Sequence, residues 1–213
     1  IQYAAMNRLL QRKVYLDDAT GLPNKNKCEE LLSEEEPDAD TGVCSFDLNN
    51  LRRINDSRGH EAGDAYIRRF AICLRASMPA EQFVGRAGGD EFLAVTHGLD
   101  REQMTQCLEK VRRDMREESK VYPDTPLSYA AGFALAGDFP GSTMRELFNC
   151  ADKNMYINKN HVKREEAAAE KHQGYQLLKL LNQHGSNFSD CLYCDTRMDT
   201  YRAIRSSENF FLA

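Results

Sequence analysis

The sequence predicts an α/β fold, an α+β sandwich in which helices flank a central, mainly antiparallel sheet. Strand and helix patterns alternate along one stretch, residues 17–164, as expected when helices cross between strands of one sheet. A hairpin pattern at residues 83–95 lies near the middle of this alternation. The resulting order of strand, helix, hairpin, helix, strand and helix is that of a ferredoxin-like core, the split βαβ arrangement.

The first elements are predicted from apolar spacing and from helix-breaking residues. Residues 1–16 carry apolar side chains at helical spacing, which predicts an N-terminal stalk or connector helix. The segment DDATGLPNKN then interrupts the helix, because Gly21 and the Leu22-Pro23 step disfavour helical backbone. Helix is expected again at residues 25–35, and the apolar run GVCSFDL at residues 42–48 predicts a buried strand.

The remaining elements follow by the same reasoning. A short helix is expected at residues 49–58, and a longer amphipathic helix follows and ends near Pro79. Beyond the hairpin we expect a helix at 101–118, a strand at 127–136, and helical structure from 143 to about 183. Residues 165–213 lie beyond the predicted domain; an amphipathic helix and the start of a further region, without an assigned function, are expected there.

The composition limits the partners and the location. The formal net charge is −5, so neither a nucleic acid nor an anionic membrane surface is expected as a general partner. No run approaches the roughly 20 apolar residues needed to span a bilayer, and no signal peptide opens the chain. Because the chain starts at Ile1 and ends in NFFLA, we expect a piece of a longer protein, whose other parts include a sensor or membrane region. Most of the seven cysteines stand in apolar stretches, so a reducing cytoplasm is the expected location.

The hairpin sequence FVGRAGGDEFLAV places two adjacent carboxylates, Asp90 and Glu91, directly after two glycines. By itself this pattern is a turn between two strands, and Asp47 is the polar end of another strand. If the hairpin pairs beside that strand, the three carboxylates meet at one sheet edge and repel one another unless a cation lies between them. Mg²⁺ is the usual answer, since it takes few protein carboxylates and leaves positions for phosphate oxygens.

Groups suited to a nucleotide follow the first strand. A helix beginning at Asn49 or Asn50 would aim free backbone N–H groups at an anion such as phosphate. Asn55 and Asp64 supply an amide and a carboxylate, which are groups that can bind the edge of a guanine base.

Two lysines, Lys159 and Lys163, lie four residues apart on one face of a predicted helix. Two cations on one face can hold a triphosphate, and they can equally form a solvated basic face. The sequence G-x-x-x-x-G-K-[ST] is absent from the chain, which excludes a P-loop enzyme.

Taken together, these residues resemble the GGDEF domains, the family of the diguanylate cyclases. GGDEF itself stands at residues 88–92. Four further signatures of the family occur in the right order and extend the resemblance over residues 17–164: DDATGLPN, DLNNLRRINDSRGHEAGD, AAGFA and ADKNMYINK.

The resemblance implies an enzyme that condenses two GTP molecules into cyclic di-GMP and releases pyrophosphate, with two GTP-loaded domains facing each other in a homodimer. It implies that Asp47 and Asp90 hold Mg²⁺ or Mn²⁺ with the Leu48 carbonyl nearby, and that Glu91 is a further metal ligand or helps to deprotonate the attacking hydroxyl. The remaining roles that it implies are close approach of the backbone to the nucleotide at Gly88 and Gly89, guanine binding by Asn55 and Asp64, and phosphate binding by Lys159 and Lys163.

Some positions depart from the family pattern, but none is a metal-binding carboxylate. Val162 stands where a glycine normally ends the last helix, and this departure bears most on Lys163, because without the glycine the helix can continue instead of turning. The R-x-x-D product-binding site of many members is missing, since residues 80–83 are Ala, Glu, Gln and Phe. Two alternatives to an active cyclase are a non-catalytic GTP-binding regulatory module and a synthase of the same fold that joins GTP with ATP.

Overall fold

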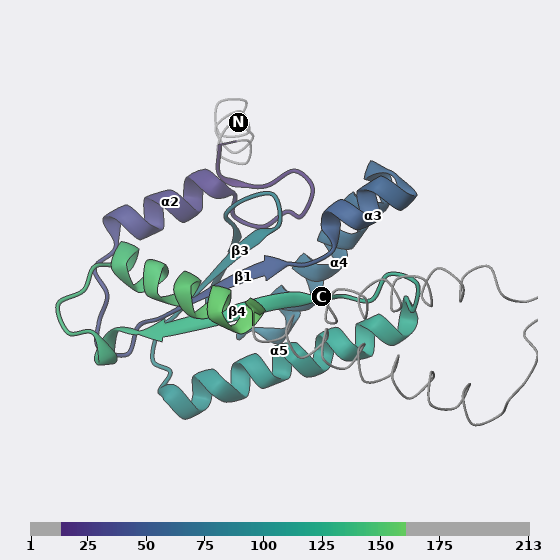
Figure 1. The fold of residues 1–213 in the computed structure, drawn as a ribbon. Coiled ribbons are helices and arrows are strands. Elements are labelled where there is room, and N and C mark those ends of the chain that lie inside the picture. The colour runs from purple at the N-terminus through teal and green to yellow at the C-terminus, as the bar shows by residue number, and fades with distance from the viewer. Residues whose placement is uncertain (1–13, 161–213) are drawn as a thin grey trace, which may run out of the picture. The chain divides into compact units, whose positions relative to one another are not determined.

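The structure is a computed structural model that describes residues 14–160 (Figure 1). The chain divides into two compact units, Ile1–Asn160 and His161–Ala213, and the second lies wholly outside the described residues. Most of the predicted N-terminal helix, the end of the predicted last helix, and the predicted region at 165–213 therefore lie outside them as well.

The predicted order of elements is confirmed. The last helix occupies 144–160 within the described residues. The other elements, in chain order, are α2 (Lys25–Glu34), β1 (Gly42–Leu48), α3 (Leu51–Arg58), α4 (His60–Ser77), β2 (Phe83–Arg86), β3 (Glu91–Thr96), α5 (Arg101–Val121), β4 (Tyr129–Leu135) and a 3₁₀ turn at Ala136–Asp138.

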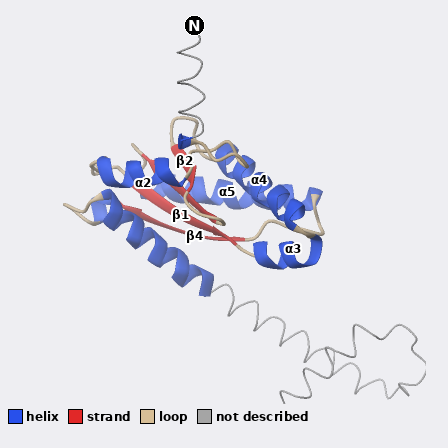
Figure 2. Cartoon of the chain, turned by 90° about the horizontal axis from the view of Figure 1, so that it is seen from above, coloured by secondary structure: helices blue, strands red, loops and turns tan. Residues whose placement is uncertain are grey.

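The strands form one antiparallel sheet in the order β2-β3-β1-β4. Helices α4 and α5 cover one face of this sheet, and α2 and the helix at 144–160 cover the other (Figure 2). The predicted fold class, an α/β sandwich with an antiparallel sheet, is thereby confirmed.

Each face of the sheet has its own hydrophobic core. On the α4 and α5 side, Phe46 of β1 lies in one cluster with Phe70 and Phe92, whose ring centroids are 4.8 Å apart. On the other side, Val43 of β1 packs in a second cluster with residues of α2 and of the helix at 144–160. Because successive side chains of a strand point to opposite faces, Asp47 lies on the same side as Val43, toward the helix at 144–160.

Helix α3 and strand β4 each begin two residues later than the sequence predicts, for identifiable reasons. Helix α3 begins at Leu51 instead of residue 49, because Asn50 has the left-handed backbone conformation (φ 64°, ψ 3°) and cannot be part of the helix. Strand β4 begins at Tyr129 instead of residue 127, because the N–H of Ser128 donates to the hydroxyl of Tyr66 and not to a neighbouring strand.

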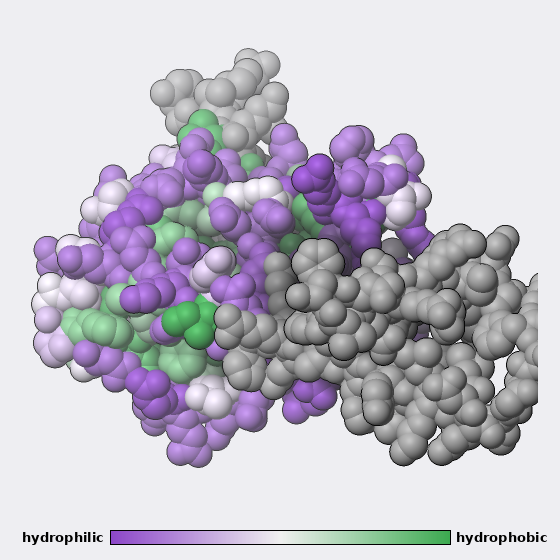
Figure 3. Space-filling view, in the orientation of Figure 1, coloured by the Kyte–Doolittle hydropathy of each residue, from purple (hydrophilic) through white to green (hydrophobic). Residues whose placement is uncertain are grey.

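The surface seen in Figure 3 is mainly hydrophilic, with apolar side chains in small areas. Two large exposed side chains, Tyr156 and Ile157, stand on the helix at 144–160. No helix within residues 14–160 combines the length and the apolar character that crossing a membrane requires.

Candidate functional site

The predicted carboxylates meet where β1 ends beside β3. Asp47 of β1 is paired directly with Glu91 of β3. The next residue, Leu48, donates its backbone N–H to the carbonyl of Asp90 at 2.8 Å. The hairpin therefore pairs beside the first strand, as the sequence analysis required.

The turn of the hairpin, residues 87–90, is closed on the backbone of Glu91. The carbonyl of Glu91 accepts hydrogen bonds from the N–H groups of Ala87, at 2.9 Å, and Gly88, at 3.1 Å. A Cβ atom on Gly88 would lie 2.5 Å from a carboxylate oxygen of Glu91, so glycine leaves the room that this side chain occupies. A Cβ on Gly89 would meet nothing within 4 Å, so the protein itself imposes no steric need for glycine there.

Arg86 braces this turn. Its guanidinium donates to the carbonyl of Gly88 at 3.1 Å and to that of Gly89 at 2.7 Å. The same group makes two hydrogen bonds of 3.0 Å to the carboxylate of Asp17. Burial alone would raise the pKa of Asp17, but hydrogen bonds from Thr20 and Arg86 outweigh it and hold that pKa below its usual value. The DDATGLPN segment is thereby tied to the turn.

Lys159 reaches the site from the opposite side. Its ammonium nitrogen lies 2.6 Å from Oδ1 of Asp47, and 22% and 17% of the two side chains are exposed. The helix that carries Lys159 packs closely against β4. A Cβ on Gly132 would lie only 2.1 Å from the backbone nitrogen of Met155, so the absence of a side chain at Gly132 allows this packing. The side-chain amide of Asn158 fixes the helix further by donating to the carbonyl of Ala131 at 3.0 Å. The glycine of AAGFA thus permits the contact between lysine and aspartate.

The site carries an excess of negative charge. The pKa of Glu91 is raised, first by burial and then by the neighbouring carboxylates of Asp90, Asp152 and Asp47, while Lys25 partly offsets the effect. Carboxylates placed together in this way favour the binding of a cation.

The donor set fits a hard divalent cation, since all its ligand atoms are oxygens. Within residues 14–160, no three His, Cys, Asp or Glu side chains are grouped as a ready-made metal site. The carboxylates are adjacent through strand pairing, but a cation already touches one of them, the ammonium group of Lys159 on Asp47. Mg²⁺ commonly relies on one or two carboxylates together with water and phosphate oxygens, so it does not require a complete protein cage.

The start of α3 presents unpaired backbone donors next to these carboxylates. Its first backbone hydrogen bond runs from the N–H of Ile54 to the carbonyl of Asn50 at 3.0 Å, and no side chain caps the helix. The N–H groups of the first turn, which precede Ile54, have no partner within the helix. They can bind an anion.

The two predicted base-binding residues lie side by side. A Cβ on Gly63 would be 1.9 Å from the side-chain oxygen of Asn55, so the amide rests directly against this glycine. Asp64 is the next residue of α4 and is exposed. An amide and a carboxylate are therefore available together where α3 and α4 meet.

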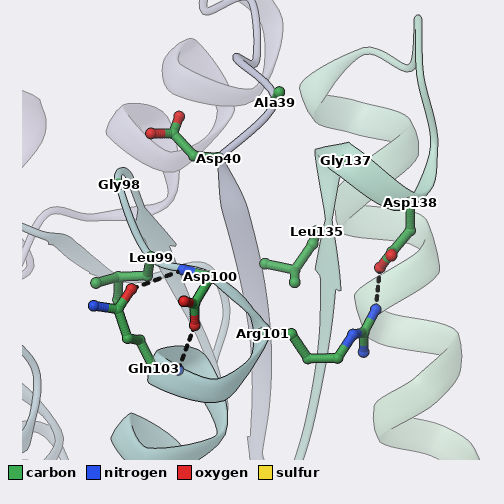
Figure 4. A pocket seen from close by; sticks show the side chains of 10 residues that line it. All are labelled: Ala39, Asp40, Gly98, Leu99, Asp100, Arg101, Gln103, Leu135, Gly137 and Asp138. Atoms are coloured by element: carbon green, nitrogen blue, oxygen red, sulfur yellow. Dashed lines mark hydrogen bonds and ion pairs between the residues drawn. The ribbon is translucent and has the colours of Figure 1, made fainter.

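Lys163 is the one predicted site residue that lies outside the described residues. A hollow lies at the other end of the sheet, where the β3–α5 turn meets the end of β4 (Figure 4). Three of the charged residues that line it make contacts within the fold: Arg101 pairs with Asp138, and Asp100 caps α5 in a reciprocal arrangement with Gln103. This hollow is a space between connecting segments, and none of the predicted site residues lines it.

Three contributors to the site were not identified from the sequence. Asp152 accepts a hydrogen bond from Ser45 at 3.3 Å and raises the pKa of Glu91, whereas Lys25 lowers that pKa. Arg86 is the third. A basic residue two positions before the first glycine of the hairpin was the available signal for it, but its partner Asp17 is 69 positions away along the chain.

A family model and several curated relatives match most of this chain. The family model described as "Diguanylate cyclase, GGDEF domain" matches residues 14–165. The chain is 29% identical over 147 residues to the cyclic di-GMP phosphodiesterase PdeR of Escherichia coli (strain K12), an alignment covering 67% of this chain and 22% of that protein. It is 30% identical over 152 residues to the diguanylate cyclase DgcP of Pseudomonas aeruginosa, covering 68% of this chain and 22% of that protein. The chain thus spans about a fifth of the length of these relatives.

A solved structure shows the same fold. It is the coiled coil and GGDEF domain of DgcB from Caulobacter crescentus in complex with c-di-GMP, with a TM-score of 0.66 and 20% identity. The match covers 75% of this chain and 88% of that chain. Since the family model extends over most of the chain and the sheet has the same architecture, this chain belongs to the GGDEF domain family.

Proposed function

We propose that this protein is a diguanylate cyclase, which condenses two GTP molecules into cyclic di-GMP. The observation that carries the proposal is the direct pairing of Asp47 with Glu91, with Asp90 in the adjoining turn and Lys159 beside them. The names of both relatives support the proposal: one is described as a cyclic di-GMP phosphodiesterase and the other as a diguanylate cyclase. The cytoplasm, where GTP is available, is the location that we propose.

Four residues are the proposed holders of the metal: Asp47 and Asp90 through carboxylates, Leu48 through its carbonyl, and Glu91. When bound, Mg²⁺ or Mn²⁺ supplies positive charge that neutralises the phosphate oxygens and favours ionisation of a nearby hydroxyl. The raised pKa of Glu91 is consistent with this assignment: burial raises it most and the neighbouring carboxylates raise it further, and a bound cation would offset both effects.

The triphosphate is proposed to bind between Lys159 and the first turn of α3. The ammonium group of Lys159 is a point charge on a flexible side chain. It now contacts Asp47, a proposed metal ligand, so it lies where it can also bind a phosphate held by the metal. Lys163 is proposed as a further phosphate-binding residue, by resemblance alone. Gly88 and Gly89 are proposed to let the phosphates approach the turn closely.

The base is proposed to bind at Asn55 and Asp64. The carboxylate of Asp64 accepts hydrogen bonds from N1–H and the 2-amino group of guanine, and Asn55 offers both a donor and an acceptor. The close contact of Asn55 with Gly63 supports this role, because it holds the amide beside the carboxylate.

The reaction needs two copies of the domain. The 3′-oxygen of one GTP forms a bond to the α-phosphorus of the GTP on the other copy, and the bond from that phosphorus to the β-phosphate oxygen breaks. Glu91 is proposed to accept the hydroxyl proton, and the leaving group is pyrophosphate. In a second step of the same kind, the 3′-oxygen of the other nucleotide forms a bond to the α-phosphorus of the first, which closes the ring and releases the second pyrophosphate. Positioning and charge neutralisation are what the protein contributes.

The proposal is tested by supplying GTP and Mg²⁺ and resolving the products by mass. We expect cyclic di-GMP and pyrophosphate from the unmodified chain. In the Glu91→Gln variant, turnover should fall by about 10² or more, the usual range for loss of a general base. Glu109→Gln, on the exposed side of α5, is the matched control and should remain active.

Two results would favour the alternatives. Binding of GTP without any cyclic product, at all protein concentrations, would indicate a regulatory module. A dominant cyclic GMP-AMP product from equal GTP and ATP would indicate a mixed synthase.

A further inference from the structure

The loop between α5 and β4, residues 122–128, is held firmly by side chains of α4 and α5. Arg69 of α4 donates to the side-chain and backbone oxygens of Thr125 at 2.8 and 2.9 Å. It also forms a two-point ion pair with Glu118 of α5 and stacks 4.0 Å from the ring centroid of Tyr122. One guanidinium thus fixes this loop to both α4 and α5.

Tyr66 holds the end of this loop. Its side chain is 1% exposed, and its hydroxyl donates to the carbonyl of Pro126 at 3.1 Å while accepting the N–H of Ser128 at 3.0 Å. A buried hydroxyl that both donates and accepts fixes its neighbours closely. The position of Ser128 is therefore set by α4.

Ser128 in turn holds Asn49. The carbonyl of Ser128 accepts the backbone N–H of Asn49 at 2.8 Å, and its hydroxyl accepts the side-chain amide of Asn49 at 3.2 Å. Asn49 stands directly between the metal-binding end of β1 and the first turn of α3. Tyr66 thus connects to the site through two consecutive sets of hydrogen bonds.

The segment 48–51 needs such support. Its N–H groups at Leu48 and Asn49 are held from opposite sides, by Asp90 of the hairpin turn and by Ser128. Asn50 follows at φ 64°, the one non-glycine residue with positive φ between residues 14 and 160. A left-handed residue persists where the surrounding contacts determine it.

We propose that Tyr66 is a positioning residue, which acts through Ser128 and Asn49 to hold segment 48–51 in the shape that binds the metal-bound triphosphate. The inference rests on the proposed function, because it concerns the phosphate end of the same site. The proposed base-binding residues, Asn55 beside Gly63 and the exposed Asp64, take no part in the hydrogen bonds that link Tyr66 to Asn49. Loss of the Tyr66 hydroxyl should consequently weaken binding of the triphosphate and leave binding of the base unchanged.

The test measures affinity, without turnover, in the full chain. The probe is 3′-deoxy-GTP with Mg²⁺, which lacks the attacking hydroxyl and so binds without reacting. Guanosine monophosphate without metal is the second probe and reports the base-binding end. The variants are Tyr66→Phe, which keeps the buried ring, and the milder Ser128→Ala, which removes only the hydroxyl contact to Asn49.

Two controls accompany these variants. Ser128→Thr retains both the N–H and the hydroxyl and should restore the affinity lost in Ser128→Ala. Ser77→Ala removes a buried hydroxyl that contacts Asp114 between α4 and α5, away from segment 48–51, and should leave both affinities within twofold. Thermal unfolding of each variant shows that the comparison is between folded proteins.

We expect the Kd for 3′-deoxy-GTP to rise about five- to tenfold in Tyr66→Phe, as for loss of a hydrogen-bonded contact, and less in Ser128→Ala. The Kd for guanosine monophosphate should stay within twofold. Equal losses for both probes, or an unchanged triphosphate affinity in Tyr66→Phe, would overturn the positioning role. Failure of the unsubstituted chain to bind 3′-deoxy-GTP would overturn the proposed function as well, and it is distinguishable because no substitution is involved.

Discussion

Gly63 and Gly132 both lie where a Cβ atom would overlap another atom, but the consequences differ. At Gly63 the neighbour is the side-chain oxygen of Asn55, and at Gly132 it is the backbone of the helix at 144–160. A side chain can rotate away, whereas packed backbone cannot move without shifting the whole helix. The first glycine therefore determines where one amide points, and the second determines whether Lys159 reaches Asp47.

Base choice is the prediction that belongs to single residues. Adenine lacks the two N–H donors from which Asp64 can accept hydrogen bonds. Bound adenine would leave the desolvated carboxylate unpaired, which costs about 1–3 kcal/mol of binding free energy or more. Asp64→Ser should loosen the choice, because a hydroxyl both donates and accepts. With equal GTP and ATP, we expect cyclic di-GMP from the unsubstituted chain and a measurable mixed product from Asp64→Ser. Identical product ratios for the two proteins would remove Asp64 from the base-binding site.

At the scale of elements, the loop at 17–24 is joined directly to the hairpin. The carbonyl of Pro23 accepts the N–H of Arg86 at 2.7 Å, in addition to the ion pair between Arg86 and Asp17. The side chains of this pair are only 15% and 21% exposed. A pair so placed contributes more than one at the surface, since water screens it less.

The pair has a pH dependence of defined sign. The pKa of Asp17 is lowered in the folded protein, so its stabilising effect is present above the unfolded pKa of about 3.9 and is lost as the pH falls through the folded pKa. Asp17→Asn should lower the unfolding temperature at pH 7 by several degrees, from roughly 1–3 kcal/mol for hydrogen bonds to a charged group. The difference should shrink below about pH 4.

Asp138→Asn is the matched control for this comparison. It removes the exposed pair with Arg101, whose side chains are 60% and 42% exposed, and should have little effect at either pH. A loss for Asp17→Asn that is the same at pH 7 and at pH 3 would contradict an ionic origin.

The residues before β2, at 79–82, make hydrogen bonds within the fold. In many members of the family, this part of the chain carries a product-binding site. Gln82 is buried and exchanges two hydrogen bonds with the backbone of His97, at 2.8 and 3.1 Å. Arg75 donates to the carbonyls of Gln82 and Pro79 from α4. The guanidinium of Arg75 is thus engaged with the backbone and does not replace the missing arginine of the R-x-x-D pattern.

Product should therefore inhibit weakly, by competition with GTP at the active site. The measurement is initial rate against added cyclic di-GMP at several GTP concentrations, where rising GTP should relieve the inhibition. Submicromolar inhibition that GTP does not relieve would show that another product-binding site exists.

For the whole molecule, the proposed chemistry requires two domains to meet. Each domain offers one half of the site, so turnover depends on the fraction of chains that are paired. We expect specific activity to rise with protein concentration until pairing is complete. The measurement is a dilution series at saturating GTP and Mg²⁺; a flat specific activity across a wide range would contradict a transient dimer.

The sequence by itself determined the fold class and the order of elements, and it predicted which acidic and base-binding residues form the proposed site. These depend on local patterns: the apolar spacing of strands and helices, and contiguous motifs such as GGDEF. Even the meeting of Asp47 with Glu91 was predictable, once the hairpin was assumed to pair beside β1.

The tertiary structure alone decided which residues from distant parts of the chain support that site. The pairing of Arg86 with Asp17, the contact of Lys159 with Asp47, and the link from Tyr66 through Ser128 each join positions 60 or more apart along the chain. Periodicity fixes the face on which a side chain lies but not its partner across two packed elements. Those partners follow from how the helices pack on the sheet, which depends on close approaches such as that at Gly132.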